Sequence, residues 1–336
     1  MTAPKVSICV PTYNGREHLG ECIASIRNQS FADFEVVICD DKSSDGTPDL
    51  SRQLAAGDSR FRFISNPHRL GLAGNWNHCV NQAAGEWIKF VFQDDIIQPG
   101  CLEKLLNACR RTNKPFGFCG RSFVFEEGVA GALRDWFDGH KQRLRLDYQA
   151  DAVIDAERAA KIAIHEPTHN MVGEPTVTLI NKSLFRELGG FDEALIQLCD
   201  SEFWCRLMVN HGAAFVAEDL ATFRIHAKAT TALNHGKRVF RMEVLDSLVL
   251  RYRFAFGRHF KPLRNSQRSG KSALSLRKEC ATAAARAWRQ ARQDGGFEEN
   301  SSISEWQAIK PHCPGLQAIA CFGELLGWMK RGKMYA

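Results

Sequence analysis

The stretch Phe90-Val-Phe-Gln-Asp94-Asp95-Ile-Ile-Gln-Pro-Gly100 places two adjacent carboxylates between an apolar run and a Pro-Gly break. The apolar run begins at Trp87 and has the length and composition of a buried strand in a parallel sheet. Ligands of open α/β sheets bind beyond the carboxyl ends of such strands. We therefore expect Asp94 and Asp95 at the rim of a ligand-binding cleft.

This carboxylate pair suits a divalent cation, because no basic residue stands beside it in the sequence. Mg²⁺ and Mn²⁺ usually bind through one or two carboxylates, with water and substrate phosphate in the remaining positions. The alternative is a solvated Asp-Asp turn that caps the helix expected to begin near Pro99.

The first 120 residues alternate between predicted strands and helices. We expect strands over residues 6–10, 34–39, 61–64 and 87–92, and helices over residues 18–29, 48–56, 74–84 and 102–110. Strands that alternate with helices of this length indicate βαβ units and a right-handed parallel sheet.

The rest of the chain is irregular at first and then helical. Residues 121–170 predict a loop region with a helix near residues 155–165. They are followed by a predicted strand over 175–181, a helix over 201–210 and a short strand over 214–217. After His226, amphipathic segments rich in Arg and Lys predict helices over residues 239–256, 272–293 and 316–331.

Charge is divided unevenly along the 336 residues, whose net charge is +6. Residues 1–223 carry 23 basic and 30 acidic side chains, whereas residues 224–336 carry 21 basic and 8 acidic ones. Such a basic region suits an anionic membrane surface, an acidic polymer or nucleic acid. Its last helix has a stripe of small and apolar residues that fits either a membrane interface or packing on the catalytic domain or a second subunit.

The twelve cysteines do not indicate a zinc site or a disulfide framework, because no two stand in CxxC spacing. Several of them, such as Cys9, Cys39 and Cys119, lie in apolar runs, and free thiols fit a reducing cytoplasm. The strand predicted from Val6 leaves no room for a signal peptide, and no apolar run is long enough to span a bilayer. We expect a cytoplasmic protein, free or peripheral at the inner face of the membrane.

Glycine-rich phosphate loops are missing from the sequence. It contains neither the G-x-G-x-x-G of dinucleotide folds nor a P-loop. The charge of a diphosphate would then be met by a cation rather than by glycine backbone, which points again to Asp94 and Asp95.

Four motifs occur in a fixed order, namely Pro11-Thr-Tyr-Asn-Gly15, Asp40-Asp41-Lys-Ser-Ser-Asp-Gly-Thr47, Gly85-Glu-Trp-Ile-Lys-Phe-Val-Phe-Gln-Asp-Asp95 and Gly189-Gly-Phe-Asp-Glu193. Together they resemble the inverting glycosyltransferases of family 2. The resemblance implies the GT-A fold, an α/β fold with a Rossmann-like mixed sheet flanked by helices. It implies a catalytic domain over residues 1–228, with a nucleotide-sugar half to residue 120 and an acceptor half from residue 121. A basic helical region over residues 229–336 would follow.

The resemblance also implies which residues bind the nucleotide. The base and ribose would be lined by Pro11, Thr12 and Tyr13. Asp41 would accept the N3–H of uracil or thymine, for which an acceptor-only carboxylate is suited. Asn66 and Asn75 would touch the nucleotide as well, although a turn or helix-cap role is the alternative for Asp41 and Asn75.

Asp94 and Asp95 resemble the DXD element of the family, with Gln93 where many members place another acid. By this resemblance Asp95 binds Mn²⁺ or Mg²⁺ directly, and Asp94 lies nearer the ribose or binds the metal through water. His226, in Phe-Arg-Ile-His-Ala, resembles the Arg-x-His segment that closes over the diphosphate and in some members supplies a metal ligand.

Asp200 lies in Cys-Asp-Ser-Glu-Phe-Trp-Cys-Arg206, which is similar to the family segment Glu-Asp-x-x-x-Trp-x-Arg at a helix start. By this similarity Asp200 is the general base that deprotonates the acceptor hydroxyl, so that a single displacement inverts the anomeric centre. Cys199 stands where the family often has an acid. The alternative is a helix start at which Asp200 is the cap and Glu202 lies in the first turn.

We therefore expect a glycosyltransferase that moves a sugar from a nucleotide-diphosphate donor, UDP- or dTDP-sugar favoured, to a bacterial surface glycan or lipid-linked acceptor. Glu174 and Trp204 are candidates to face the acceptor, with core packing as the alternative for Trp204. A nucleotidyltransferase of similar fold and a non-enzymatic polyanion-binding module are the rival functions. Nucleic acid is not expected as a partner, because aromatic residues do not interleave with the basic ones. The sequence leaves open the sugar, the acceptor, and whether the chain forms a homo-oligomer.

Overall fold

The computed structural model describes residues 3–129, 131, 134–135, 137, 139, 153–226, 238–265, 273–294, 298 and 300–332. The chain divides into two compact units, and neither is continuous in sequence. The first consists of Met1–Ala156, Asn170–Glu193 and His211–Ala227. The second consists of Glu157–His169, Ala194–Asn210 and Lys228–Ala336.

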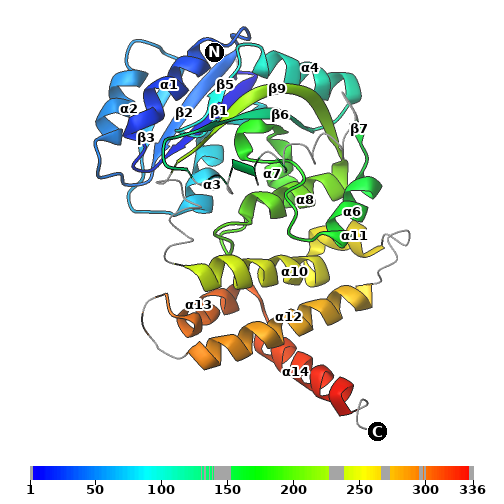
Figure 1. The fold of residues 1–336 in the computed structure, drawn as a ribbon. Coiled ribbons are helices and arrows are strands. Elements are labelled where there is room, and N and C mark those ends of the chain that lie inside the picture. The colour runs from blue at the N-terminus through cyan, green and yellow to red at the C-terminus, as the bar shows by residue number, and fades with distance from the viewer. Residues whose placement is uncertain are drawn as a thin grey trace. The chain divides into compact units, whose positions relative to one another are not determined.

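The first unit is built on a sheet whose N-terminal half is parallel (Figure 1). Its strands are β1 (Val6–Thr12), β2 (Phe34–Asp40), β3 (Phe61–Ser65) and β4 (Trp87–Phe90). Strand β1 pairs with both β2 and β4, and β3 pairs with β2, all in parallel. Because the strands run in one direction, the residues that follow them meet at a single edge of the sheet.

Helices connect these strands and cover the sheet. They are α1 (Arg16–Arg27), α2 (Thr47–Ala55), α3 (Leu72–Gln82) and α4 (Cys101–Thr112). Helix α1 buries Leu19, Cys22, Ile23 and Ile26, which recur with the spacing of one helix face. Helix α3 packs on β1 and β2.

The other half of the sheet is mixed. It contains β6 (Phe116–Phe125), β8 (Thr178–Asn181), β9 (Ala213–Ile225), and the short strands β5 (Ile96–Ile97) and β7 (Val153–Ile154). Strand β8 is antiparallel to β4 and β6, whereas β6 and β9 are parallel. Among the described residues the strand order is β3-β2-β1-β4-β8-β6-β9-β5, with β7 paired to β9. A 3₁₀ turn over Pro175–Val177 precedes β8, and α7 (Ser183–Leu188) follows it.

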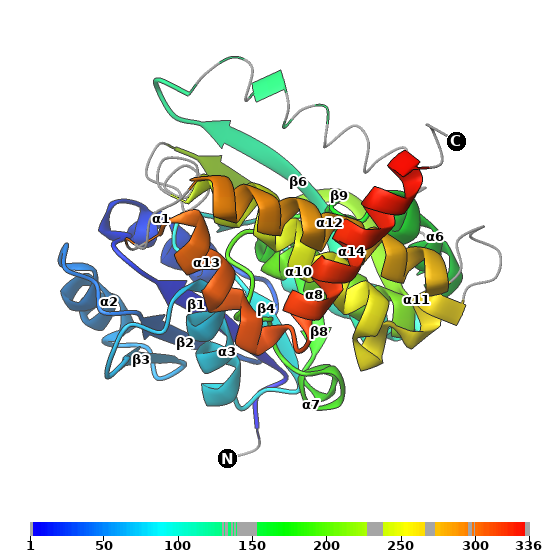
Figure 2. The same cartoon turned by 90° about the horizontal axis from the view of Figure 1, so that it is seen from below.

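The second unit is helical (Figure 2). Its longer helices are α6 (Ala156–His165), α8 (Cys199–His211), α10 (Asp246–Phe256), α12 (Ala273–Asp294), α13 (Ser302–Ile309) and α14 (Leu316–Gly332). A π-helical turn, Phe240–Leu245, leads into α10, and the short helices Arg258–Phe260, α11 (Lys261–Asn265) and Lys310–His312 complete it. Helix α12 packs on α10, α13 and α14. Fully buried Trp306 on α13 contacts Trp288 on α12, with ring centroids 5.2 Å apart.

The elements predicted before residue 113 are confirmed, with ends that shift by a few residues. Strand β6, helices α7 and α13, and most of β9 were not predicted. Strand β6 contains Gly117 and Gly120, which weaken a strand pattern. The pattern of β9 was cut short by Glu218 and Asp219, which interrupt its apolar run.

Candidate active site

The loop after β1 is tied to the loop after β4 by one side chain. Gln93 Oε1 accepts a hydrogen bond from Tyr13 N (2.9 Å), and Gln93 Nε2 donates one to Tyr13 O (3.1 Å). A carboxylate at this position could accept the first bond but could not donate the second. With glutamine instead of an acid at position 93, both backbone groups of Tyr13 are hydrogen-bonded, which fixes the loop predicted to bind the base.

The other residues of this loop lie at the end of β1. Pro11 and Thr12 are buried, and Tyr13 is half-buried. The guanidinium of Arg69 lies over the Tyr13 ring, 4.1 Å from its centroid. A partly exposed aromatic ring stacked with a cation is suited to a nucleotide, although the contact itself stays a prediction.

Asp41 follows β2 and is only 3% exposed. Its Oδ1 accepts hydrogen bonds from Asn66 Nδ2 (3.0 Å) and Leu70 N (2.6 Å), and its Oδ2 accepts one from Gly71 N (2.9 Å). A carboxylate offers about four acceptor positions. One position on Oδ2 is left for the predicted imide N–H.

Asn66 and Asn75 hold Asp41 in place. Asn66 is fully buried and donates to both Asp41 and Asn75 Oδ1 (2.9 Å). Asn75 is 4% exposed and donates to Cys39 O (3.0 Å). In this structure the two amides support the Asp41 carboxylate, and their contact with the nucleotide stays a prediction.

Asp94 and Asp95 follow β4 in different surroundings. Asp95 is fully buried, accepts a hydrogen bond at Oδ2 from Thr176 Oγ1, and accepts one at Oδ1 from Arg224 N (3.3 Å). The Asp94 side chain is 18% exposed, and its Oδ2 lies 3.0 Å from His226 Nε2. Of the predicted metal ligands, His226 thus contacts Asp94, and Asp95 is the neighbour of Asp94 in the sequence.

Thr176 links Asp95 to the core of the sheet. Its hydroxyl also accepts a hydrogen bond from Phe92 N (3.2 Å), and its carbonyl accepts one from Lys89 Nζ. Lys89 is fully buried in β4. Thr176 therefore connects Asp95 to β4, the strand that precedes the carboxylate pair.

Glu174 lies beside the carboxylate pair and is itself paired. Its Oε2 lies 2.6 Å from Nε of Arg121, a side chain only 2% exposed on β6. Arg121 Nη1 also donates to Val172 O (3.3 Å). The Glu174 side chain keeps 18% exposure, so its predicted contact with an acceptor is sterically open but untested.

The electrostatics of this edge favour a cation. Burial raises the pKa of Asp95 well above its usual range, and the charges of Asp94 and Glu174 raise it further. The hydrogen bonds from Thr176 and Arg224 lower the pKa without cancelling these effects. A divalent cation would stabilise the ionised carboxylates. The donor set of two carboxylates and an imidazole fits Mn²⁺ and, through its oxygens, Mg²⁺.

His226 follows β9 and is held at the same place. The hydrogen bond that the Asp94 carboxylate accepts raises the pKa of His226 above its ordinary value, against the opposite effect of burial. Arg224, two residues earlier, donates through Nε to Asp94 O (3.2 Å) and through Nη2 to Glu21 (2.6 Å). The Arg-x-His segment therefore contacts both residues of the carboxylate pair, Arg224 through hydrogen bonds to Asp94 and Asp95 and His226 through Asp94.

The residues predicted for proton transfer belong to the second unit. Asp200 lies in the first turn of α8 and is half-buried, and its Oδ1 accepts from Ser201 N (2.6 Å). Glu202 is 2% exposed and forms a two-bond pair with Arg206, at 3.0 Å and 2.6 Å. Trp204 is fully buried, so its ring packs in the core in this structure, as the alternative interpretation expected. Glu202 is therefore committed to a buried ion pair, and the role of Asp200 in proton transfer stays a prediction.

Sequence reasoning missed the support of this segment by Asp246. Asp246, the first residue of α10, is fully buried, and its Oδ2 accepts hydrogen bonds from the backbone N–H groups of residues 196–198 at 3.0, 2.6 and 3.0 Å. Arg241 Nε lies 3.5 Å from Asp246 Oδ1, and its Nη1 lies 3.5 Å from Glu305. The C-terminal helices therefore set the path of the chain into α8 and toward Asp200.

The apolar stripe of the last helix is partly buried against another helix. Leu316 and Ala320 are buried, and a Cβ on Gly323 would lie 1.9 Å from Ala281 O, so α14 lies directly on α12. The helix that α14 packs on belongs to neither the catalytic domain nor a second subunit, the two packing partners considered above, while Phe322 and Leu325 remain exposed. No described helix combines the length and apolar character needed to cross a bilayer.

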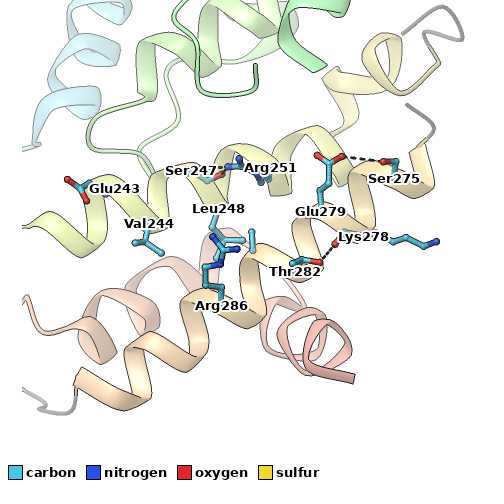
Figure 3. Close-up of a pocket in the computed structure, with 11 residues that line it drawn as sticks. Glu243, Val244, Ser247, Leu248, Arg251, Ser275, Lys278, Glu279, Thr282 and Arg286 are labelled. Carbon is cyan, nitrogen blue, oxygen red and sulfur yellow. Dashed lines mark hydrogen bonds between the residues drawn. The ribbon is translucent and has the colours of Figure 1, made fainter. Parts of the chain in front are cut away.

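The second unit also has a groove of about 490 Å³ between α10 and α12 (Figure 3). Figure 3 shows Ser247 and Arg251 on α10, and Glu279 and Thr282 on α12. Its charged lining residues are Glu243, Arg251, Lys278, Glu279 and Arg286. The opposite charges nearly balance, and none of the predicted site residues lines the groove.

Comparison with known proteins identifies the family. The model of the family described as glycosyl transferase family 2 matches residues 7–187, more than half of the chain. The chain belongs to glycosyl transferase family 2. It is therefore a glycosyltransferase, and neither the nucleotidyltransferase nor the non-enzymatic alternative is retained.

Relatives in sequence are bacterial. An uncharacterized protein of Mycobacterium tuberculosis is 32% identical over 229 residues, 68% of this chain and 69% of the relative. The GalNAc(5)-diNAcBac-PP-undecaprenol β-1,3-glucosyltransferase of Campylobacter jejuni is 38% identical over 37% of this chain and 40% of its own length. The UDP-Glc:α-D-GlcNAc-diphosphoundecaprenol β-1,3-glucosyltransferase WfgD of Escherichia coli is 31% identical over 38% and 49%, respectively. The chain thus matches less than half of either glucosyltransferase.

Solved structures establish the fold as GT-A. Residues 1–349 of Staphylococcus aureus TarS, in complex with UDP-GlcNAc, superpose with a TM-score of 0.60 at 16% identity, over 94% of this chain and 83% of that one. The mannosyltransferase PcManGT of Pyrobaculum calidifontis, in complex with GDP-Man and Mn²⁺, gives a TM-score of 0.52 at 18% identity, over 96% and 85%. The predicted fold class is therefore confirmed.

Proposed function

We propose that this glycosyltransferase moves a sugar from a UDP- or dTDP-sugar to a glycan or lipid-linked acceptor, by a metal-dependent single displacement with inversion. The observation that carries the proposal is the fully buried Asp95 carboxylate after β4, whose pKa is raised by burial and by the charges of Asp94 and Glu174. Such a buried carboxylate is costly to ionise unless a cation joins it.

In this mechanism the chain's own residues bind the donor and move one proton. Asp41 and the Tyr13 loop hold the nucleotide, and Asp95 with His226 would hold the cation beside the diphosphate. Asp200 accepts the proton of the acceptor hydroxyl while that oxygen bonds to the anomeric carbon. The bond to the diphosphate breaks in the same step, so the configuration inverts. When bound, Mg²⁺ or Mn²⁺ supplies stabilisation of the negative charge that grows on the leaving diphosphate.

The acceptor class is supported by the relatives. The printed names of both glucosyltransferases describe acceptors linked to undecaprenol through a diphosphate, and one of them names UDP-Glc as donor. We therefore propose a lipid-linked bacterial glycan intermediate as the acceptor of this chain as well.

A donor panel tests the proposal without a known acceptor. UDP-, dTDP- and GDP-sugars are incubated with the protein and Mn²⁺, and released nucleoside diphosphate and thermal stabilisation are measured. We expect the largest response from a uridine or thymidine donor. Proton NMR of the freshly released sugar should show the anomer opposite to that of the donor. Release of the same anomer, or a response to GDP-sugars alone, contradicts the proposal.

Contact with an anionic membrane is a separate proposal, supported by the excess of basic residues after residue 223 and by the exposed side chains of Phe322 and Leu325. Flotation with anionic liposomes at low salt compares the full chain with a Phe322→Ser, Leu325→Ser double variant. We expect the double variant to float less. Equal flotation of the two proteins removes α14 from membrane binding.

A further inference from the structure

Three side chains that can ligate a metal lie close together next to the carboxylate pair. Of these, only His226 has a role in the mechanism described above. His18 lies on α1, Glu126 directly follows β6, and His226 directly follows β9. Strands β6 and β9 are parallel and pair Phe125 with Ile225, and Glu126 N donates to Ile225 O (3.1 Å). The backbone therefore brings Glu126 and His226 to the same sheet edge, independently of any ligand.

The two histidines face each other across this edge. Their ring centroids are 5.3 Å apart, with an angle of 60° between the planes. One ligand atom from each of His18, Glu126 and His226 lies within 4.8 Å of the other two. The side chains are only 13%, 32% and 10% exposed, respectively, so they are largely held in place by the surrounding protein.

The contact between His18 and Glu126 has the geometry of two ligands of one cation. His18 Nε2 lies 3.0 Å from Glu126 Oε1. Nevertheless, Nε2 is buried and makes no hydrogen bond of acceptable angle within the described part of the chain. Two ligands that each lie about 2.1 Å from a cation are about 3.4 Å apart in tetrahedral geometry and about 3.0 Å apart at right angles, so a small outward shift of either side chain accommodates a tetrahedral cation. Their lone pairs then point at the cation rather than along the line between them.

We propose that His18, Glu126 and His226 form a binding site for a divalent cation of the zinc class, separate from the cation position predicted at Asp95. Two imidazoles and one carboxylate suit Zn²⁺, Co²⁺ or Ni²⁺, whereas Mg²⁺ prefers oxygen ligands. Asp94 Oδ2 lies 3.0 Å from Nε2 of the shared His226.

The site has a consequence for transfer, and this consequence rests on the proposed function. A cation beside His18 would hold His226 through one ring nitrogen while the other faces Asp94, so that the ring would not be free to close over the diphosphate. Zn²⁺ in the first position therefore slows transfer, while Mg²⁺ at Asp95 supports it.

Binding is tested on the full chain without nucleotide, by calorimetric titration with Zn²⁺ and by the visible absorption of bound Co²⁺. We expect one site in the wild type, a loss of at least about a hundredfold in affinity in His18→Gln and in Glu126→Gln, and retention in Asp95→Asn. Thermal melting in EDTA verifies that each variant is folded. Unchanged Zn²⁺ affinity in both His18→Gln and Glu126→Gln, or its loss in Asp95→Asn, overturns the site.

His211 offers a matched control. Its Nε2 also lies 3.0 Å from a glutamate, Glu187 Oε1, but no third ligand joins them among the described residues. His211→Gln should keep full Zn²⁺ affinity. If it loses affinity as His18→Gln does, the titration reports surface histidines and the proposal is wrong.

The effect on transfer is measured separately, as donor hydrolysis in saturating Mg²⁺ with micromolar Zn²⁺. We expect inhibition of the wild type and resistance in His18→Gln, which lies outside the proposed catalytic machinery. Equal inhibition of both proteins overturns the role of His226 as the shared ligand. Absence of hydrolysis in both proteins without Zn²⁺ counts against the proposed function and leaves the binding result to decide the site.

Discussion

The carboxylates that follow β2 and β4 occupy equivalent places in the fold and opposite electrostatic situations. Asp41, after β2, accepts hydrogen bonds from one amide side chain and two backbone N–H groups. Asp95, after β4, is also buried but accepts hydrogen bonds from only two groups in the described part of the chain, beside the charges of Asp94 and Glu174. Asp41 is thus compensated by hydrogen bonds from the chain, whereas Asp95 is the position at which we propose that a cation supplies the compensation.

The two carboxylates therefore differ in what each can contribute to binding and to chemistry at this sheet edge. A carboxylate such as Asp41, which already accepts three hydrogen bonds from the chain, stabilises the loop around it and keeps one acceptor position for a ligand. Such a group can select the nucleotide base but contributes little to catalysis. An under-compensated carboxylate attracts a cation that can stabilise a leaving group. Identical substitutions at the two positions should therefore have different effects.

The largest effect is expected from Asp95→Asn. Loss of the cation ligand removes several kcal/mol of leaving-group stabilisation, so transfer should fall by about 10³–10⁴-fold. Because the substitution removes a buried charge next to two carboxylates, thermal stability should be equal or higher. Steady-state kinetics and a melting curve measure the two effects. Near-normal turnover in the folded variant would mean that Asp95 is structural.

Asp200→Asn tests whether chemistry also depends on the second unit. Nucleotide-sugar affinity should be retained while turnover falls by about 10²–10⁴-fold, the range for a general base. Glu202→Gln is the control, because it breaks a buried ion pair and should cost about 3–5 kcal/mol of stability while the folded fraction keeps its turnover. The reverse outcome, with normal turnover in Asp200→Asn, would transfer the role to Glu202.

Asp41→Asn makes the same chemical change as Asp95→Asn at the satisfied position. An amide cannot accept from all three donors, and a buried N–H left without an acceptor costs about 1–3 kcal/mol. We expect a lower melting temperature and weaker UDP binding, but turnover at saturating donor within about tenfold of wild type. A fall in turnover as large as that of Asp95→Asn would remove the distinction between the two carboxylates.

The smallest effect is expected from Gln93→Glu, which restores the acid common in the family. The new carboxylate still accepts from Tyr13 N but faces Tyr13 O without a proton to donate, a loss of about 0.5–1.5 kcal/mol. The donor KM should rise by up to about tenfold while kcat stays near wild type. Tighter donor binding would show instead that a third acid improves the cation site and that the link to Tyr13 has little weight.

The N-terminal half of the fold could be predicted because its signals are local. Apolar runs such as Trp87–Phe90, and helix faces such as that of α1, lie in short windows of sequence. Strand β6 could not be predicted in this way, since its glycines are tolerated by pairing with β8 and β9 from distant parts of the chain.

The candidate site shows the same division between local and distant information. Motifs predicted the carboxylates and His226, but not the residues that hold them. Thr176 acts on Asp95 across the sheet, and Asp246 binds residues 196–198 from a helix far along the chain. Neither pairing leaves a pattern within its own segment. Burial of Asn66 and Trp204 likewise depends on the folded surroundings rather than on their neighbours in sequence.

The central claim, a cation-dependent transfer built on the carboxylates after β4, is tested most directly by donor turnover in excess EDTA. The wild-type protein is assayed for release of nucleoside diphosphate before chelation, in EDTA, and after Mn²⁺ or Mg²⁺ is added back in excess. We predict that turnover is lost in EDTA and restored by either cation in the wild type, and that it is not restored in Asp95→Asn. Full turnover of the wild type in excess chelator would contradict the account.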